Sequence, residues 1–64
     1  MKYIWFDTIN SEEIEVWGST MVDATLRIQK FYLIDRDITV LIKDMYCDYE
    51  NRYGYIYDYV VNKC

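Results

Sequence analysis

The sequence contains no histidine. Histidine is the usual general base at neutral pH and the commonest metal ligand, so its absence argues against catalysis and against a metal site. Two cysteines without histidine do not make a zinc site, and no serine or cysteine has a base that would complete a catalytic triad. Gly18 and Gly54 are isolated, which excludes a phosphate-binding loop. We expect a protein that is not an enzyme and that has no cofactor or metal.

The two cysteines, Cys47 and Cys64, are too few for a disulfide framework, which favours a reducing compartment. Cys47 is expected to pack as a small hydrophobic residue and Cys64 to be a free thiol, with a Cys47–Cys64 bridge as the alternative. The sequence also lacks an apolar run of membrane-spanning length and the apolar segment of a signal peptide. We predict a cytoplasmic protein, in the host cytoplasm if it is viral.

Basic residues are also few, with Lys+Arg 7 against Asp+Glu 11 and a formal net charge of −4. Binding to phosphates requires clustered lysine and arginine side chains. The charge balance therefore predicts no direct contact with nucleic acid and no attraction to an anionic membrane.

Aromatic side chains, by contrast, are abundant: they make up 19% of the chain, and hydrophobic residues make up 53%. The 64 residues are predicted to form a single domain, 1–64. A chain of this size buries only about 60% of its unfolded surface, so association with a partner would add stability.

Residues 2–17 are predicted to form a β-hairpin, because KYIWFD and EIEVW both alternate and TINSE lies between them. If Asp7 lies opposite Glu13, one face of the hairpin is apolar and faces the core. That face consists of Ile4, Phe6, Ile14 and Val16. The other face consists of Tyr3, Trp5, Asp7, Glu13, Glu15 and Trp17.

Residues 20–34 are predicted to form a helix, because Thr20 and Asp23 approximate a capping box. Asp23, Arg27 and Lys30 share one narrow polar side. The remaining side of this helix is an apolar arc that is wider than one sheet face covers. Either loops or a second subunit must therefore cover the rest of the arc. In a rival interpretation, residues 31–35 form a strand paired with residues 38–42.

Residues 38–61 are predicted to form a second hairpin, with ENRYG as its loop. If Tyr49 lies opposite Tyr55, the core face is rich in apolar and aromatic side chains: Met45, Cys47, Tyr55, Tyr57 and Tyr59. The other face carries Asp44, Tyr46, Asp48, Ile56 and Asp58. Val40 and Ile42 fall on this acidic face, which requires a bulge there or cover on both sides.

The predicted fold is α+β, with the order ββαββ and a four-stranded, mostly antiparallel sheet that has one helix packed on one face. The opposite face is predicted to bind a partner, because exposed large rings in a patch are typical of an interface. Its predicted binding residues are Trp5, Asp7, Glu13, Glu15, Trp17, Asp44, Tyr46, Asp48 and Asp58. The alternative is that these residues are ordinary solvent-facing side chains whose rings stabilise cross-strand pairs.

Two functions are compatible with such a face. In the first, the protein is a non-enzymatic inhibitor or adaptor that occupies a basic, nucleic-acid-binding surface of a partner protein such as a nuclease. The acids would steer association, while Trp5, Trp17 and Tyr46 would supply affinity. In size and charge the chain resembles phage-encoded inhibitors of host nucleases, including anti-CRISPR and anti-restriction proteins. In the second, a homo-oligomer such as a homodimer sequesters or senses a small molecule at its subunit interface.

Overall fold

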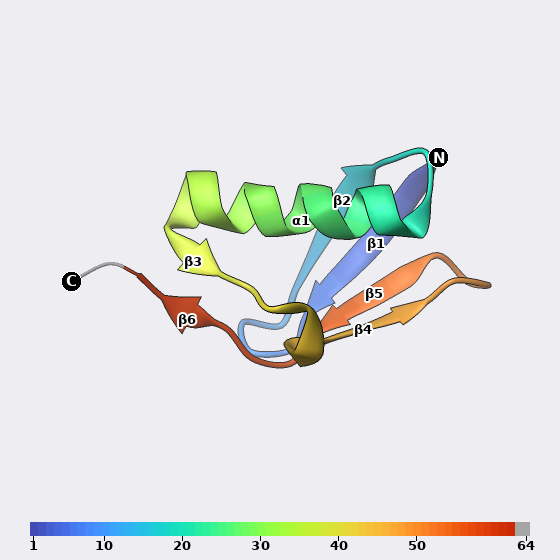
Figure 1. The fold of residues 1–64 in the computed structure, drawn as a ribbon. Helices are drawn as coiled ribbons and strands as arrows, with labels where there is room; N and C mark the ends of the chain where they lie inside the picture. The colour runs from blue at the N-terminus through green and yellow to red at the C-terminus, as the bar shows by residue number, and fades with distance from the viewer. Residues whose placement is uncertain (63–64) are drawn as a thin grey trace.

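The structure is a computed structural model in which residues 1–62 are described, and these residues form an α-helix, a short 3₁₀ helix and six strands (Figure 1). In chain order the elements are β1 (Lys2–Asp7), β2 (Glu12–Trp17), α1 (Met21–Arg36), β3 (Ile38–Thr39), the 3₁₀ helix η1 (Ile42–Asp44), β4 (Met45–Asp48), β5 (Tyr53–Ile56) and β6 (Val60–Val61).

Four of the strands form one sheet in the order β2-β1-β5-β4, and β3 pairs with β6 in a separate two-stranded sheet. Figure 1 shows α1 lying over one side of the larger sheet, as predicted for this α+β chain. The prediction of a mostly antiparallel sheet is matched in part. The outer pairs are antiparallel, but the central strands β1 and β5 are parallel, so the sheet is mixed. The order ββαββ is matched only in part.

The first hairpin spans the predicted residues, but its register differs by one residue. Trp5 lies opposite Ile14 rather than Glu15, because the turn occupies only residues 8–11. A shift of one residue inverts one strand relative to the other. Strand β2 keeps its predicted orientation, with Ile14 and Val16 packed in or against the core.

Strand β1 has the reverse of its predicted orientation, so that its two faces are exchanged. Tyr3, Trp5 and Asp7 are buried under α1, and Trp5 and Asp7 are 0% exposed. Ile4 and Phe6 lie on the opposite face. The prediction that Trp5 and Asp7 belong to the exposed binding face is therefore wrong. Both faces of β1 carry large apolar side chains, so alternation alone does not show which face is buried.

Helix α1 begins where the capping residues predict. The Thr20 hydroxyl accepts a hydrogen bond from the Asp23 backbone N–H at 3.1 Å. The helix continues to Arg36, and it ends because Asp37 adopts a left-handed conformation with φ of 55°. Residues 31–35 are helical, so the rival interpretation of a strand there is wrong.

The predicted hairpin over residues 38–61 is broken into shorter pieces. After β3 the chain leaves the sheet at Val40 and forms η1 before it enters β4. The predicted conflict at Val40 and Ile42 is resolved in this way, because Val40 is buried while Ile42 is 66% exposed at the start of η1.

The register between β4 and β5 differs from the predicted one by three residues. Tyr46 lies opposite Tyr55 rather than Asp58, because the turn occupies residues 49–52 and β5 starts earlier than expected. An odd shift again inverts one strand. Ile56 is therefore in the core, and the prediction that Tyr55 packs under the helix is wrong.

The centre of the core is a contact between β1 and β5. The Trp5 ring lies against Gly54, where an added Cβ would come within 2.2 Å of the ring atom Cε3. Glycine is therefore required at this position by close approach and not by an unusual backbone angle. The buried cluster comprises Tyr3, Trp5, Val16, Met21, Ala24, Ile28, Tyr32, Ile38, Val40 and Ile56.

Cys47 is half-buried and packs against this cluster, which confirms its predicted role as a small hydrophobic side chain. Its Sγ atom lies 3.6 Å from the hydroxyl oxygen of Thr25. Cys64 lies outside the described residues, and so does the alternative Cys47–Cys64 bridge.

Replacing Trp5 with alanine is expected to reduce the free energy of unfolding by about 3–5 kcal/mol, because the substitution leaves a large cavity in the core. Trp17→Ala is the matched control, since Trp17 is 64% exposed, and it should change the free energy by no more than about 0.5 kcal/mol. Urea denaturation of the two variants measures both values. Equal losses would contradict the burial of Trp5.

Candidate functional site

The sheet face that points away from α1 is the candidate site, and we call it the open face. Side chains alternate along a strand, and cross-strand partners share a face. Because Tyr3 and Trp5 face α1, the pairing assigns the following side chains to the open face: Lys2, Ile4, Phe6, Glu13, Glu15, Trp17, Tyr46, Asp48, Tyr53 and Tyr55.

Large rings dominate the open face. Trp17 and Tyr46, on the two outer strands, are 64% and 56% exposed. The rings of Tyr46 and Tyr55 are 6.2 Å apart between centroids, and Tyr57 continues the row with its ring stacked 6.3 Å from that of Tyr55. Ile4 fills the sheet centre beside these rings and is only partly exposed. Such a continuous apolar patch is unusual on a solvent-facing sheet.

The carboxylates of the open face lie on its outer strands. Glu15 pairs with Lys2 at 3.5 Å, and both side chains are well exposed, so this ion pair adds little stability. Glu13 on β2 and Asp48 on β4 form no salt bridge within residues 1–62. The side-chain and backbone N–H groups of Asn51 lower the pKa of Asp48, which keeps this carboxylate ionised. The open face therefore has negative charge on both sides of an aromatic centre.

The structure brings together some of the predicted binding residues and separates others. Glu13, Glu15, Trp17, Tyr46 and Asp48 share the open face. Their role in binding stays a prediction.

The remaining predicted residues lie elsewhere. Trp5 and Asp7 are buried beneath the helix. Asp44 is half-buried at the end of η1, and Asp58 is exposed in the segment that follows β5.

Sequence reasoning missed the central residues of this face: Ile4, Phe6, Tyr53, Tyr55 and Tyr57. Tyr53 and Tyr55 alternate within β5 and so share one face of the strand, and Tyr57, just beyond the strand, stacks on Tyr55. The sequence pattern predicts Tyr55 and Tyr57 in the core, together with Tyr59, and places Tyr53 in the loop of the hairpin. The useful signal was Gly54 between Tyr53 and Tyr55, because a glycine next to a buried tryptophan places the adjacent tyrosines on the opposite side.

A second polar cluster surrounds Asp7, between the sheet and α1. The Asp7 carboxylate accepts hydrogen bonds from the backbone N–H groups of Ile9 and Asn10 at 2.9 and 3.0 Å. It also accepts from the Asn10 side chain at 3.1 Å and from the Tyr32 hydroxyl at 2.8 Å. These four bonds fill the capacity of a carboxylate, so Asp7 has a structural role and is not free to bind a ligand.

The environment of Asp7 also changes how it and Tyr32 titrate. Burial alone would raise the pKa of Asp7, but the hydrogen bonds from Asn10, Tyr32 and Ile9 outweigh this effect and hold the pKa below its ordinary value. Burial raises the pKa of Tyr32, and the negative charge of Asp7 raises it further. The carboxylate is therefore ionised and the hydroxyl protonated at neutral pH.

Arg36 closes this cluster at the end of α1. Its two terminal nitrogens donate to the two carboxylate oxygens of Glu12, each at 2.7 Å. Its guanidinium carbon lies 5.3 Å from the ring centre of Phe31 and 5.2 Å from that of Tyr32. One arginine is thus held by a carboxylate and by aromatic rings together.

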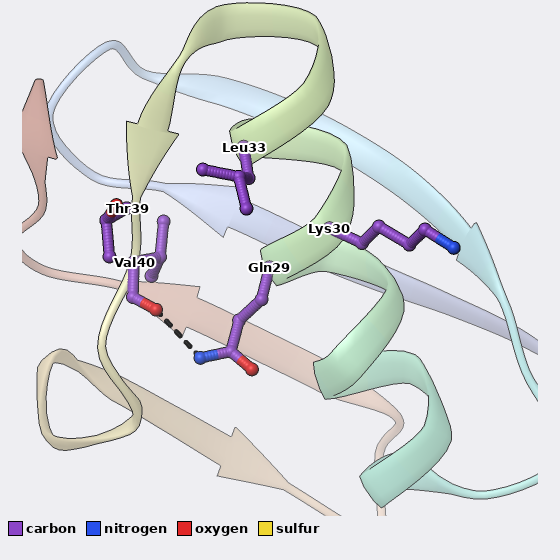
Figure 2. Close-up of a pocket in the computed structure, with 5 residues that line it drawn as sticks. All are labelled: Gln29, Lys30, Leu33, Thr39 and Val40. Carbon is purple, nitrogen blue, oxygen red and sulfur yellow. Dashed lines mark hydrogen bonds between the residues drawn. The ribbon is translucent and has the colours of Figure 1, made fainter. Parts of the chain in front are cut away.

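Two apolar hollows lie along α1. The first, of about 250 Å³, lies between α1 and β3 (Figure 2). Gln29 donates to the Val40 carbonyl oxygen at 2.7 Å across it, Leu33 points toward β3, and Lys30 extends away. The second, of about 150 Å³, lies beside Leu26 and Ile42. Both volumes are below the roughly 300–1,000 Å³ of typical ligand pockets.

Within residues 1–62, no three His, Cys, Asp or Glu side chains gather in a way that could hold a metal ion. No helix in the same part of the chain is long and apolar enough to cross a membrane. Comparison with known families, with curated proteins and with solved structures gives no match for this chain. Its function is therefore inferred from its own residues.

The lowered pKa of Asp7 predicts an acid-sensitive contribution to stability. That contribution is fully present above the pKa of an unfolded aspartate, near 3.9, and is lost as the pH falls through the lower folded value. Asp7→Asn should cost about 1–3 kcal/mol at pH 6, and its deficit relative to the wild type should shrink below about pH 3. Tyr32→Phe, which removes one donor, should show a smaller deficit. Denaturation at both pH values measures these differences, and a deficit of equal size at both would contradict the prediction.

Proposed function

We propose that the protein is a non-enzymatic inhibitor or adaptor that binds a partner protein through the open face. The observation that carries the proposal is the arrangement of that face. Aromatic rings cross the sheet from Tyr46 to Phe6, carboxylates lie on both outer strands, and no described segment covers them. This composition favours a partner with a basic surface, such as one that binds nucleic acid.

The two kinds of side chain have different expected roles in binding. Tyrosine and tryptophan are enriched among residues that dominate interface affinity, which supports Trp17 and Tyr46 as the anchors. Glu13 and Asp48 lie at the sides, where charge mainly affects the association rate and the choice of partner. Because Asp7 is buried, the open face is less acidic than the sequence predicts, and its rings supply most of the proposed affinity.

Inhibition would follow from competition for the same surface. A protein that occupies a basic groove excludes the phosphates that the groove would otherwise bind. Acting in a cytoplasm, the protein would then block a nuclease or another nucleic-acid-binding protein, and this activity requires no catalytic residue of its own. This chain resembles phage-encoded inhibitors of host nucleases in size and charge, and that resemblance favours this class of target.

Reversing the charges of the open face is expected to abolish partner binding without unfolding the protein. The variant combines Glu13→Lys with Asp48→Lys. The control combines Asp35→Lys with Glu50→Lys, which changes the net charge equally at exposed positions outside the open face. Affinity capture from host lysate treated with nuclease should recover the same protein with the wild type and the control but not with the open-face variant.

The captured complex should also weaken as salt is raised, because the Debye length falls from about 10 Å at 0.1 M to about 3 Å at 1 M. Recovery of the same protein by the open-face variant, at unchanged yield and salt dependence, would show that the open face is not the binding surface.

Self-association is a second candidate, favoured by apolar side chains that α1 and η1 leave exposed. Val22, Leu26 and Ile42 are each more than half exposed around the smaller hollow. A second copy packed there would complete the cover that the wide apolar arc of α1 requires. Since each hollow is small, a small molecule would need walls from both copies.

Leu26→Glu tests this candidate, because a charge at the centre of an apolar interface should convert a dimer into a monomer. Arg27→Glu is a control at the neighbouring exposed position on the helix. Sedimentation equilibrium distinguishes the outcomes, and a wild type that is monomeric at every concentration would exclude a homo-oligomer.

A further inference from the structure

We propose that the open face binds arginine side chains of an extended partner segment, each guanidinium stacked on an aromatic ring and paired with a carboxylate of the neighbouring strand. This inference rests on the proposed function and names the chemistry of the partner at the same surface.

The chain contains an internal example of such a contact. Arg36 makes two 2.7 Å hydrogen bonds with Glu12 while its guanidinium lies over the rings of Phe31 and Tyr32. Arginine suits this geometry better than lysine, because its planar group forms two parallel bonds with a carboxylate and stacks on a ring at the same time.

The open face repeats the combination of ring and carboxylate on both of its sides. Asp48 lies directly opposite Tyr53 between β4 and β5, and Glu13 lies directly opposite Phe6 between β2 and β1. Cross-strand partners have Cβ atoms about 4.5–5.5 Å apart, so each carboxylate is beside a ring. Lys2 is paired with Glu15, and no described basic residue forms a salt bridge with Glu13 or Asp48.

The spacing of the two pairs indicates an extended occupant. They lie on the outer strands of a four-stranded sheet, so three strand spacings of about 4.8 Å separate them by about 14 Å across the sheet. Asp48 is level with Glu15 and not with Glu13, and this offset of two residues along the strands brings the separation to about 16 Å. In an extended segment, residues i and i+4 point to the same side and lie about 13 Å apart. This spacing is about 3 Å shorter than the separation of the carboxylates, a difference that two long arginine side chains span. Two arginines separated by three residues would therefore reach both carboxylates, with Tyr55 and Ile4 beneath the residues between them.

The probe is a synthetic ten-residue peptide of glycine, serine and threonine that carries two arginines at positions i and i+4. A second peptide carries lysines at those positions. Titration into isotope-labelled full-length protein at low salt, followed by NMR, maps the amides that shift and gives both dissociation constants. Shifts should concentrate at residues of β1, β2, β4 and β5, and the arginine peptide should bind about threefold to tenfold more tightly than the lysine peptide.

Conservative variants test the carboxylates one at a time. Glu13→Gln and Asp48→Asn should each weaken binding of the arginine peptide by about twofold to fivefold. Asp35→Asn, which removes an exposed acid from α1, should leave binding unchanged. Equal affinity for both peptides, or shifts confined to the hollows along α1, would overturn the inference. Amide shifts at the open face that depend on protein concentration in the absence of peptide would show that a second copy occupies this face. Such shifts would also overturn the inference.

The outcome separates this inference from the proposed function. If neither peptide binds at millimolar concentration while capture of the partner still depends on Glu13 and Asp48, the arginine inference fails and the proposed function stands. If neither peptide binds and no partner is captured through Glu13 and Asp48, both the arginine inference and the proposed function fail.

Discussion

The contact between Trp5 and Gly54 determines how the rest of the sheet is arranged. The indole ring occupies the space that a Cβ at residue 54 would need, so β5 lies directly beside β1 beneath the helix. Once Trp5 faces α1, alternation directs the neighbouring side chains of both strands to the other side. Those side chains form the centre of the open face: Ile4, Phe6, Tyr53 and Tyr55. The exposed surface is thus set by a contact in the core.

The sequence predicts the outer strands and the helix well, and the central strands poorly. In β2 the acids alternate with Ile14 and Val16, and this contrast correctly shows which face is buried. In β1 and β5 both faces carry large apolar groups, so no such contrast exists. A shift of one residue in one hairpin and three in the other was enough to invert both strands.

Long-range effects also account for what the sequence could not show about the site. The parallel pairing of β1 with β5 joins two segments that no local pattern connects. The sequence predicts Asp7 as a surface acid, because its burial depends on α1 and on Tyr32, which is 25 residues away along the chain. Asp48 shows the opposite outcome: local alternation correctly predicts that it lies on the sheet face away from the helix. Chemically identical carboxylates are thus fully buried at Asp7 and only half-buried, on the open face, at Asp48.

The parallel pairing of the central strands also has a consequence for folding. Residue 4 pairs with residue 53, so this pairing closes a loop that includes most of the chain. Contacts between such distant residues form slowly, whereas the β1–β2 hairpin and α1 involve neighbouring residues and can form early. Phe6 and Tyr55 become neighbours only when this long-range pairing forms. A partner that recognises both rings would therefore bind the fully folded chain and ignore partly folded or nascent ones.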